Sequence, residues 1–284
     1  MKNLRRSFSL IPDEYINPEP IPKSISQFVK DYEANTFKRS AILDFLNRVK
    51  PIIKGHSGGP IVVSTTQENS LEQIIRAVEN LDTSYLTIQG PPGAGKSYTA
   101  KHVIAKLVQA GHKIGISSNS HKAINNLLLI TAKYCNEQHI KATFVCTKAT
   151  ETDLIEEGII ISENNKLASY IQSGCVLGTT AWGFARDDMA DTLDYLFVDE
   201  AGQVATANLI AMSRCAKNIV IMGDQMQLGQ PAQGTHPAES GLSILDYLLH
   251  DSPTISEDMR VFLETTYRMH PEINKFISDS LCLC

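Results

Sequence analysis

The chain lacks any long apolar run. None of its 284 residues lies in a stretch that approaches the roughly 20 apolar residues of a membrane-spanning helix. The N-terminal segment MKNLRRSFSLIPDEY has no apolar core of the kind that signal peptides carry. These absences argue against a membrane protein and a secreted one. We expect a cytoplasmic chain with no membrane partner.

Cysteine patterns typical of metal sites are also missing. The six cysteines, at positions 135, 146, 175, 215, 282 and 284, form no C-x-x-C pair and no Cys/His spacing typical of zinc. We expect reduced thiols, and neither a zinc site nor an iron–sulfur cluster.

An excess of positive charge is missing too. The chain has 26 Lys and Arg against 31 Asp and Glu, which gives a net charge of −5. Nucleic-acid-binding domains usually carry a basic patch, so composition gives no support to nucleic-acid binding. A function of that kind has to be argued from motifs.

The clearest motif is GPPGAGKS, which fits the phosphate-loop pattern G-x-x-x-x-G-K-[ST]. Glycines at positions 93 and 95 let the backbone turn sharply and direct its N–H groups at phosphate oxygens. Lys96 is expected to reach the β- and γ-phosphates, and the Ser97 hydroxyl to ligate Mg²⁺. The predicted nucleotide-binding loop comprises Gly90, Pro91, Pro92, Gly93, Ala94, Gly95, Lys96 and Ser97.

The flanks of this loop have the required character. Residues 85–89 form a short apolar run typical of a buried strand, and an apolar stripe at helical spacing follows the loop until Gly111. The alternative, a surface turn rich in Gly and Pro, is disfavoured by these flanks. The loop is therefore predicted to bind a nucleoside triphosphate.

The remainder of the chain predicts an α/β fold. Residues 1–60 are interpreted as a leader, with an extended Pro-rich segment IPDEYINPEPIPKS and one helix that ends before Pro51. Residues 61–284 alternate between helical and strand patterns, and several strands are unbroken apolar runs, as in a parallel sheet covered on both faces. The predicted strands are 85–89, 113–117, 142–146, 174–178, 194–198, 218–222 and 261–265.

The stretch LFVDEAGQ carries the second signal. Its apolar strand ends in two carboxylates, which places them at the carboxyl edge of the sheet beside the phosphate loop. Asp199 is expected to hold Mg²⁺ and Glu200 to act as general base toward the attacking water. An acidic loop after a strand is the alternative for this stretch taken alone.

Two further stretches carry candidate nucleotide contacts. Gln227 follows the apolar run IVIM in IVIMGDQMQLGQP, where a neutral amide can bond a γ-phosphate oxygen or water; an incidental Gln in a polar turn is the alternative. In TTYRMHP, Arg268 offers a bidentate fork for phosphate and Tyr267 a flat surface for a base. His270 is interpreted as a helix-entry residue rather than a metal ligand.

In this order the motifs resemble superfamily 1 helicases, specifically the group with DEAxQ and YRMHP motifs. The matching series is GPPGAGKS, SSNSHKAINNLL, VLGTTAW, VDEAGQ, GDQMQLGQP and YRMHP. The resemblance implies a RecA-like P-loop NTPase sandwich of three layers with a mostly parallel sheet. It also implies ATP and Mg²⁺ as cofactors, and ATP hydrolysis coupled to movement along a single strand.

The resemblance assigns further roles at the nucleotide. Gln73, which lies 23 residues before Lys96, would read the adenine edge. Tyr267 would stack on adenine, and Gln227 and Arg268 would sense the γ-phosphate, so that Arg268 joins Lys96 and Glu200 as a catalytic residue.

For nucleic acid, the resemblance points to Ser118, Asn119 and Thr180 as contacts to the backbone of a single strand. Trp182 is a candidate stacking platform for a base, with packing in the core as the alternative. DNA is favoured over RNA because the relatives linked to a RecB-like nuclease act on DNA, and the implied polarity is 5′ to 3′. A nuclease module is a possible partner, but no nuclease site is predicted in this chain.

The chain departs from the family pattern in two ways. The span 130–176 leaves no room for the barrel that several relatives insert there. Only 13 residues follow Pro271, so we expect that the second RecA-like domain, with its arginine finger, is missing and that the chain is truncated. The alternative function is a nucleotide-dependent module that binds nucleic acid or protein without motor activity.

Overall fold

The computed structural model describes residues 19–34, 39–63, 69–149, 152–224, 226–227, 237–250 and 255–265. Within these ranges the strands form one eight-stranded sheet in the order β4-β3-β5-β2-β6-β7-β1-β8, and every pairing is parallel. The α/β fold with a parallel sheet is confirmed. The strands are β1 Tyr85–Gln89, β2 Ile114–Ser117, β3 Thr143–Cys146, β4 Ile160–Ile161, β5 Cys175–Gly178, β6 Leu193–Val198, β7 Ala216–Gly223 and β8 Arg260–Phe262.

Each predicted strand is present close to its expected position. The strand expected at 261–265 begins one residue earlier and ends at Phe262. The sequence did not predict β4, whose two residues, Ile160 and Ile161, are both exposed and are too short a run to indicate a strand.

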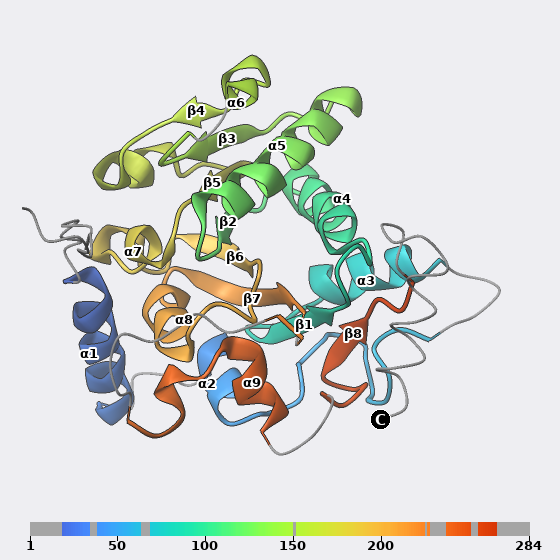
Figure 1. Ribbon diagram of the computed structural model, residues 1–284, viewed down its shortest axis with the longest axis vertical. Coiled ribbons are helices and arrows are strands. Elements are labelled where there is room, and N and C mark those ends of the chain that lie inside the picture. The colour runs from blue at the N-terminus through green and yellow to red at the C-terminus, as the bar shows by residue number, and fades with distance from the viewer. Residues whose placement is uncertain are drawn as a thin grey trace, which may run out of the picture.

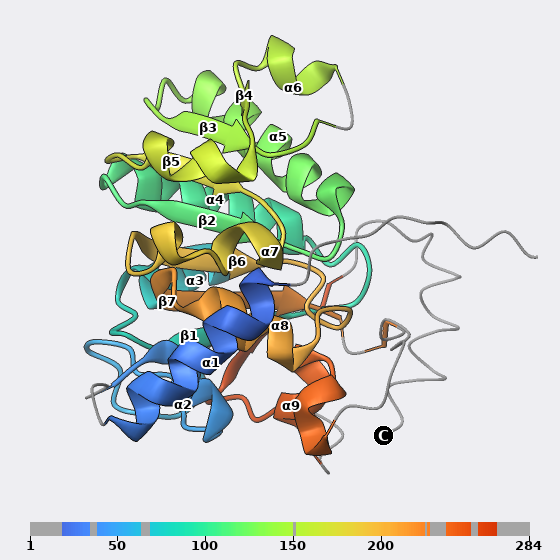
Figure 2. The ribbon, with the colours of Figure 1, turned by 90° about the vertical axis from the view of Figure 1, so that its left-hand side faces the viewer.

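Helices cover both faces of the sheet, as Figures 1 and 2 show. One face carries α3 Ser70–Glu79, α4 Lys96–Gln109 and α5 His121–Glu137, whose buried residues share one apolar cluster with the sheet. The other face carries α1 Pro20–Glu33, α2 Ala41–Leu46, α7 Ala181–Phe184, α8 Thr206–Ser213 and α9 Ile244–Leu249, which share the second cluster. Shorter elements are α6 Asp153–Glu156, η1 Asn164–Tyr170, η2 Asp187–Met189 and η3 Ala238–Gly241.

The two clusters follow from the alternation of side chains along each strand. In β1 every residue is buried, with Leu86 and Ile88 in the first cluster and Tyr85 in the second. A strand covered on both faces favours apolar residues on both sides, and this explains the apolar runs of the sequence, although β1 also buries Thr87 and Gln89.

The expected extended conformation of IPDEYINPEPIPKS is wrong over residues 20–24, which open α1, and the described part of the segment 1–60 contains two helices rather than the predicted one. Proline is tolerated in the first helical turn, where its missing N–H has no partner to lose. Ser24 and Phe28 bury this helix on the second cluster, and the Ser24 hydroxyl donates to the Ala211 carbonyl oxygen at 2.7 Å. Burial against α8 therefore stabilises a helix that the Pro-rich composition does not predict.

Strand order determines which loops meet at the carboxyl edge of the sheet. β1 pairs with β7, β7 with β6, and β6 with β2. The segments that follow these four strands carry GPPGAGKS, DQMQ, DEAGQ and SNSH, and parallel pairing brings them to the same edge. None of the described helices is long and apolar enough to cross a bilayer.

Candidate nucleotide-binding site

The loop between β1 and α4 has the backbone conformation of a phosphate cradle. Gly93 and Gly95 have φ angles of 82° and 86°, in the left-handed region that favours glycine. At Gly90 an added Cβ would lie 2.9 Å from the Ala94 Cβ and 3.0 Å from the Leu263 carbonyl oxygen. The loop therefore needs glycine at these positions, and its close-packed backbone can turn its N–H groups toward one anion.

Lys96 and Ser97 open helix α4 directly after this loop. The Lys96 ammonium donates to the carbonyl oxygens of Gly90 and Pro91, the latter at 3.0 Å. This places its positive charge over the cradle, at the N-terminal end of a 14-residue helix. Both the ammonium and the helix end favour a bound phosphate.

A cavity of about 460 Å³ lies against this loop and joins it to the other motifs. The residues around it come from the phosphate loop, from α4 and α5, and from the segments after β6 and β7. Its lining consists of Pro92, Gly93, Gly95, Lys96, Ser97, Tyr98, Ala123, Asn126, Asp199, Glu200 and Gln227.

Asp199 is a half-buried carboxylate of the site. Burial raises the pKa of Asp199 to about 6. The rise is opposed by the backbone N–H of Glu200, which donates to Asp199 Oδ1 at 2.9 Å. The Glu200 carboxylate adds to the rise, and the positive charge of Lys96 opposes it. A cation next to this group would stabilise its ionised form. The side chain is thus suited to help hold a divalent metal ion.

Glu200 has a φ angle of 53°, unusual for a residue other than glycine. The segment 199–203 makes three hydrogen bonds with the segment 117–119. Asp199 N–H donates to the Ser117 carbonyl oxygen at 2.8 Å, and Ser118 Oγ donates to Glu200 Oε2 at 3.4 Å. Asn119 Nδ2 donates to the Gln203 carbonyl oxygen. The predicted nucleic-acid residues Ser118 and Asn119 therefore lie beside the predicted general base. Ser118 is only 3% exposed.

Gln227 reaches the cavity from the segment after β7. Its backbone N–H donates to the Asp224 carbonyl oxygen at 3.3 Å, and the Met226 N–H donates to Asp224 Oδ1 at 2.9 Å. Among the described residues, the buried side-chain oxygen of Gln227 has no hydrogen-bond partner. Asp224, 4% exposed, therefore shapes the turn that presents Gln227. The sequence analysis gave it no role, although the Gly-Asp pair after a buried strand was visible.

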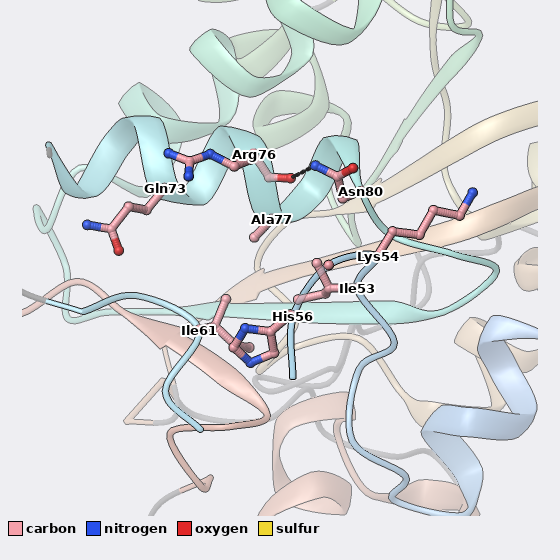
Figure 3. A pocket seen from close by; sticks show the side chains of 9 residues that line it. Ile53, Lys54, His56, Ile61, Gln73, Arg76, Ala77 and Asn80 are labelled. Atoms are coloured by element: carbon pink, nitrogen blue, oxygen red, sulfur yellow. Dashed lines mark hydrogen bonds between the residues drawn. The ribbon is translucent and has the colours of Figure 1, made fainter. Parts of the chain in front are cut away.

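Gln73 does not line the cavity at the phosphate loop. Its carboxamide makes two hydrogen bonds of 2.9 Å with Val63, accepting from the backbone N–H and donating to the carbonyl oxygen. Figure 3 shows it on α3, one turn from Arg76 and across from Ile61, where it borders a separate cavity of about 190 Å³. The same donor and acceptor pair can bond the edge of an adenine.

A cavity of about 610 Å³ lies on the other side of the phosphate loop. Ala94 lines it together with Val63, Arg260 and Phe262, and Phe262 is 43% exposed. The sequence analysis predicted Ala94 but not Val63, Arg260 or Phe262, because neither the segment before α3 nor β8 carries a recognised motif. Tyr267 and Arg268, the predicted contacts for the base and the γ-phosphate, lie outside the described residues.

The remaining predicted nucleic-acid residues lie after β5. Thr180 is half-buried and precedes α7 as its N-cap, without a hydrogen bond from its side chain to the helix. Trp182 is also half-buried and packs against the second apolar cluster, while its indole N–H has no partner among the described residues. Of the two readings of Trp182, this position favours core packing.

Tyr98 and Asn126 line the cavity but were not predicted. Tyr98 follows the phosphate-loop serine and is 56% exposed, and Asn126 lies on α5. The motifs carried no signal for either, because their place in the cavity depends on the packing of α4 against α5.

The comparisons with known proteins agree with this site. Residues 64–239 match the family model described as an AAA domain. The chain is 24% identical over 288 residues to the DNA replication ATP-dependent helicase/nuclease DNA2 of Gallus gallus, covering 92% of this chain and 28% of that protein. The corresponding protein of Saccharomyces cerevisiae is 25% identical over 184 residues, covering 63% of this chain and 12% of its own length. The chain thus spans little more than a quarter of its longer-matching relative.

Solved structures give weaker similarities. The Arterivirus nonstructural protein 10 helicase has a TM-score of 0.43 at 16% identity, covering 70% of this chain and 39% of that one. A Bacteroides sp Pif1 in complex with ADP-AlF4 has a TM-score of 0.40 at 16% identity, covering 76% and 46%. The resemblance to superfamily 1 helicases, read from the motifs, is confirmed by the family model and the helicase relatives. Since the family model matches more than half of the chain's length, the chain belongs to the AAA domain family.

Proposed function

We propose that this chain is the ATP-binding and ATP-hydrolysing domain of a superfamily 1 helicase, which couples hydrolysis to movement along a single strand of nucleic acid. The observation that carries the proposal is the cavity in which Lys96, Ser97, Asp199, Glu200 and Gln227 meet. These residues come from three separate motifs of the sequence and supply what phosphoryl transfer requires: a cation, a metal site, a base and a neutral amide.

The phosphate groups of ATP are expected to lie on the glycine cradle. Lys96 then exchanges its contacts with the loop carbonyl oxygens for the β- and γ-phosphates, where its charge is better compensated. Ser97 and Asp199 together with phosphate oxygens would hold Mg²⁺, which needs few protein ligands. The metal would neutralise charge that develops on the phosphates.

Glu200 is assigned as the general base. Its carboxylate borders the cavity, and one of its oxygens already accepts from Ser118. The other oxygen is available to take a proton from the attacking water. Gln227 would bond the γ-phosphate or that water with its unpaired oxygen or its amide group. From the resemblance, Arg268 would add positive charge at the γ-phosphate and Tyr267 would stack on adenine.

The nucleic acid is proposed to be single-stranded DNA at the carboxyl edge of the sheet, near Asn119 and Thr180. Support comes from the relatives, whose names include DNA replication, and from the position of both residues, which are half-buried and follow the neighbouring parallel strands β2 and β5. With a net charge of −5, few phosphates can be neutralised, so binding of single-stranded DNA should be weak. The helicase/nuclease names of the relatives make a nuclease module a possible partner.

Lys96→Ala tests the nucleotide site. Removing the ammonium should abolish most affinity for Mg·ATP, because the positive charge over the cradle is lost. The fold should survive, because Lys96 belongs to neither apolar cluster and its ammonium lies at the loop, where it donates to the carbonyl oxygens of Gly90 and Pro91. Isothermal titration calorimetry measures the affinity, and circular dichroism checks the fold. Equal affinity in both proteins would contradict the proposal.

A further inference from the structure

The segments after β2 and β6 meet through side chains as well as backbone. Ser117 pairs with Val198 in the sheet, so the residues that follow each of them lie level with one another. Ser118 and Glu200 are 82 positions apart in the chain, yet their side chains are hydrogen-bonded. The Asn119 side chain donates to the backbone carbonyl oxygen of Gln203.

The burial of Ser118 decides what its hydroxyl can reach. At 3% exposure it offers almost no surface to a strand of nucleic acid. Its hydroxyl carries one proton, and that proton is donated to the Glu200 carboxylate. Asn119 is half-buried and remains the more accessible residue of the pair.

Glu200 needs such support because its backbone lies at a φ angle of 53°. A residue other than glycine rarely adopts this region, and it persists there only where its surroundings hold it. Ser118 fixes one carboxylate oxygen and Asn119 fixes the backbone three residues further on. Glu200 itself lines the cavity.

We propose that Ser118 is a positioning residue for the general base, and that its hydroxyl serves Glu200 rather than the nucleic acid. The inference rests on the proposed function of Glu200. A base held by a third group is a common requirement where a proton has to be taken from a reacting oxygen. Ser118 thus acts through Glu200 and touches no substrate atom.

The test uses the full 284-residue chain and single-turnover hydrolysis of labelled ATP. Ser118→Ala should slow hydrolysis by roughly tenfold, the order expected for a lost hydrogen bond to a charged group. ATP affinity by calorimetry and single-stranded DNA affinity by fluorescence anisotropy should stay at the wild-type level. Ser118→Thr keeps a hydroxyl and should restore the rate.

A double-mutant cycle shows whether Ser118 acts through Glu200. In a Glu200→Gln background, Ser118→Ala should cause no further loss of rate. Ser117→Ala is the matched control, since that neighbouring buried hydroxyl has no hydrogen-bond partner among the described residues, and it should leave the rate unchanged.

Three results would overturn the inference: a wild-type rate in Ser118→Ala, an equal slowing in the Glu200→Gln background, or a loss of DNA affinity in place of rate. If the wild-type chain itself fails to bind Mg·ATP, the proposed function fails as well, which separates the two outcomes.

Discussion

At the scale of single residues, Glu200 separates hydrolysis from nucleotide binding. Glu200→Gln keeps the size of the side chain and an oxygen that can accept from Ser118, but it removes the base. ATP should therefore still bind, while hydrolysis should fall by roughly 10²- to 10⁴-fold. Single-turnover hydrolysis and calorimetry on the same preparation measure the two effects. Full turnover in the variant would show that another group activates the water.

At the scale of elements, the contact between the segments after β6 and β7 depends on Gly202. A Cβ at this position would lie 2.6 Å from the Asp224 carbonyl oxygen, which is backbone and cannot turn aside. Gly202→Ala should push the two segments apart and cost about 1–3 kcal/mol of stability. Each kcal/mol corresponds to a fall in Tm of about 2–4 °C for a domain of this size.

Gly158→Ala is the control for this prediction. Gly158 has a φ angle of 78° and open space around its Cα, so that variant carries backbone strain without a clash. Differential scanning calorimetry should show a lower Tm for Gly202→Ala than for the wild-type chain. Of the two variants, only Gly202→Ala should also weaken ATP binding, because Glu200 and Gln227 belong to the displaced segments. Unchanged ATP affinity in Gly202→Ala would mean that the two segments tolerate separation.

At the scale of the whole molecule, the described residues form one parallel sheet with the cavity at its carboxyl edge, and by the resemblance to superfamily 1 helicases they would supply one wall of a nucleotide cleft. An arginine finger from an opposite wall is worth about 10³ to 10⁵ in rate in comparable phosphoryl-transfer enzymes. We expect a polypeptide of these 284 residues to bind Mg·ATP, to hydrolyse it slowly without clear stimulation by single strands, and to unwind nothing. A tailed-duplex unwinding assay measures this. Unwinding by the purified monomer would contradict the expectation of a single wall.

Helix α1 and Gln73 show where local patterns were insufficient. The Pro-rich run of the first residues suggested an extended chain, but two prolines fit the first turn of α1 and burial on α8 stabilises the remainder. The assignment of Gln73 to adenine, made from its distance to Lys96, stays a prediction. The structure adds that its carboxamide bonds Val63, ten positions away, a contact that no pattern identified.

The sequence by itself determined the parts of this protein that are continuous in the chain. The phosphate loop needs a strand, a glycine turn and a helix in direct succession, and parallel strands buried on both faces favour apolar runs. Both features could therefore be predicted from the sequence. Only the tertiary structure decided which loops meet. The order of β1, β7, β6 and β2 places Ser118 against Glu200 and Asp224 beneath Gly202. These contacts join residues that are 22 and 82 positions apart in the chain. They depend on strand pairing, and local propensity carries no information about that pairing.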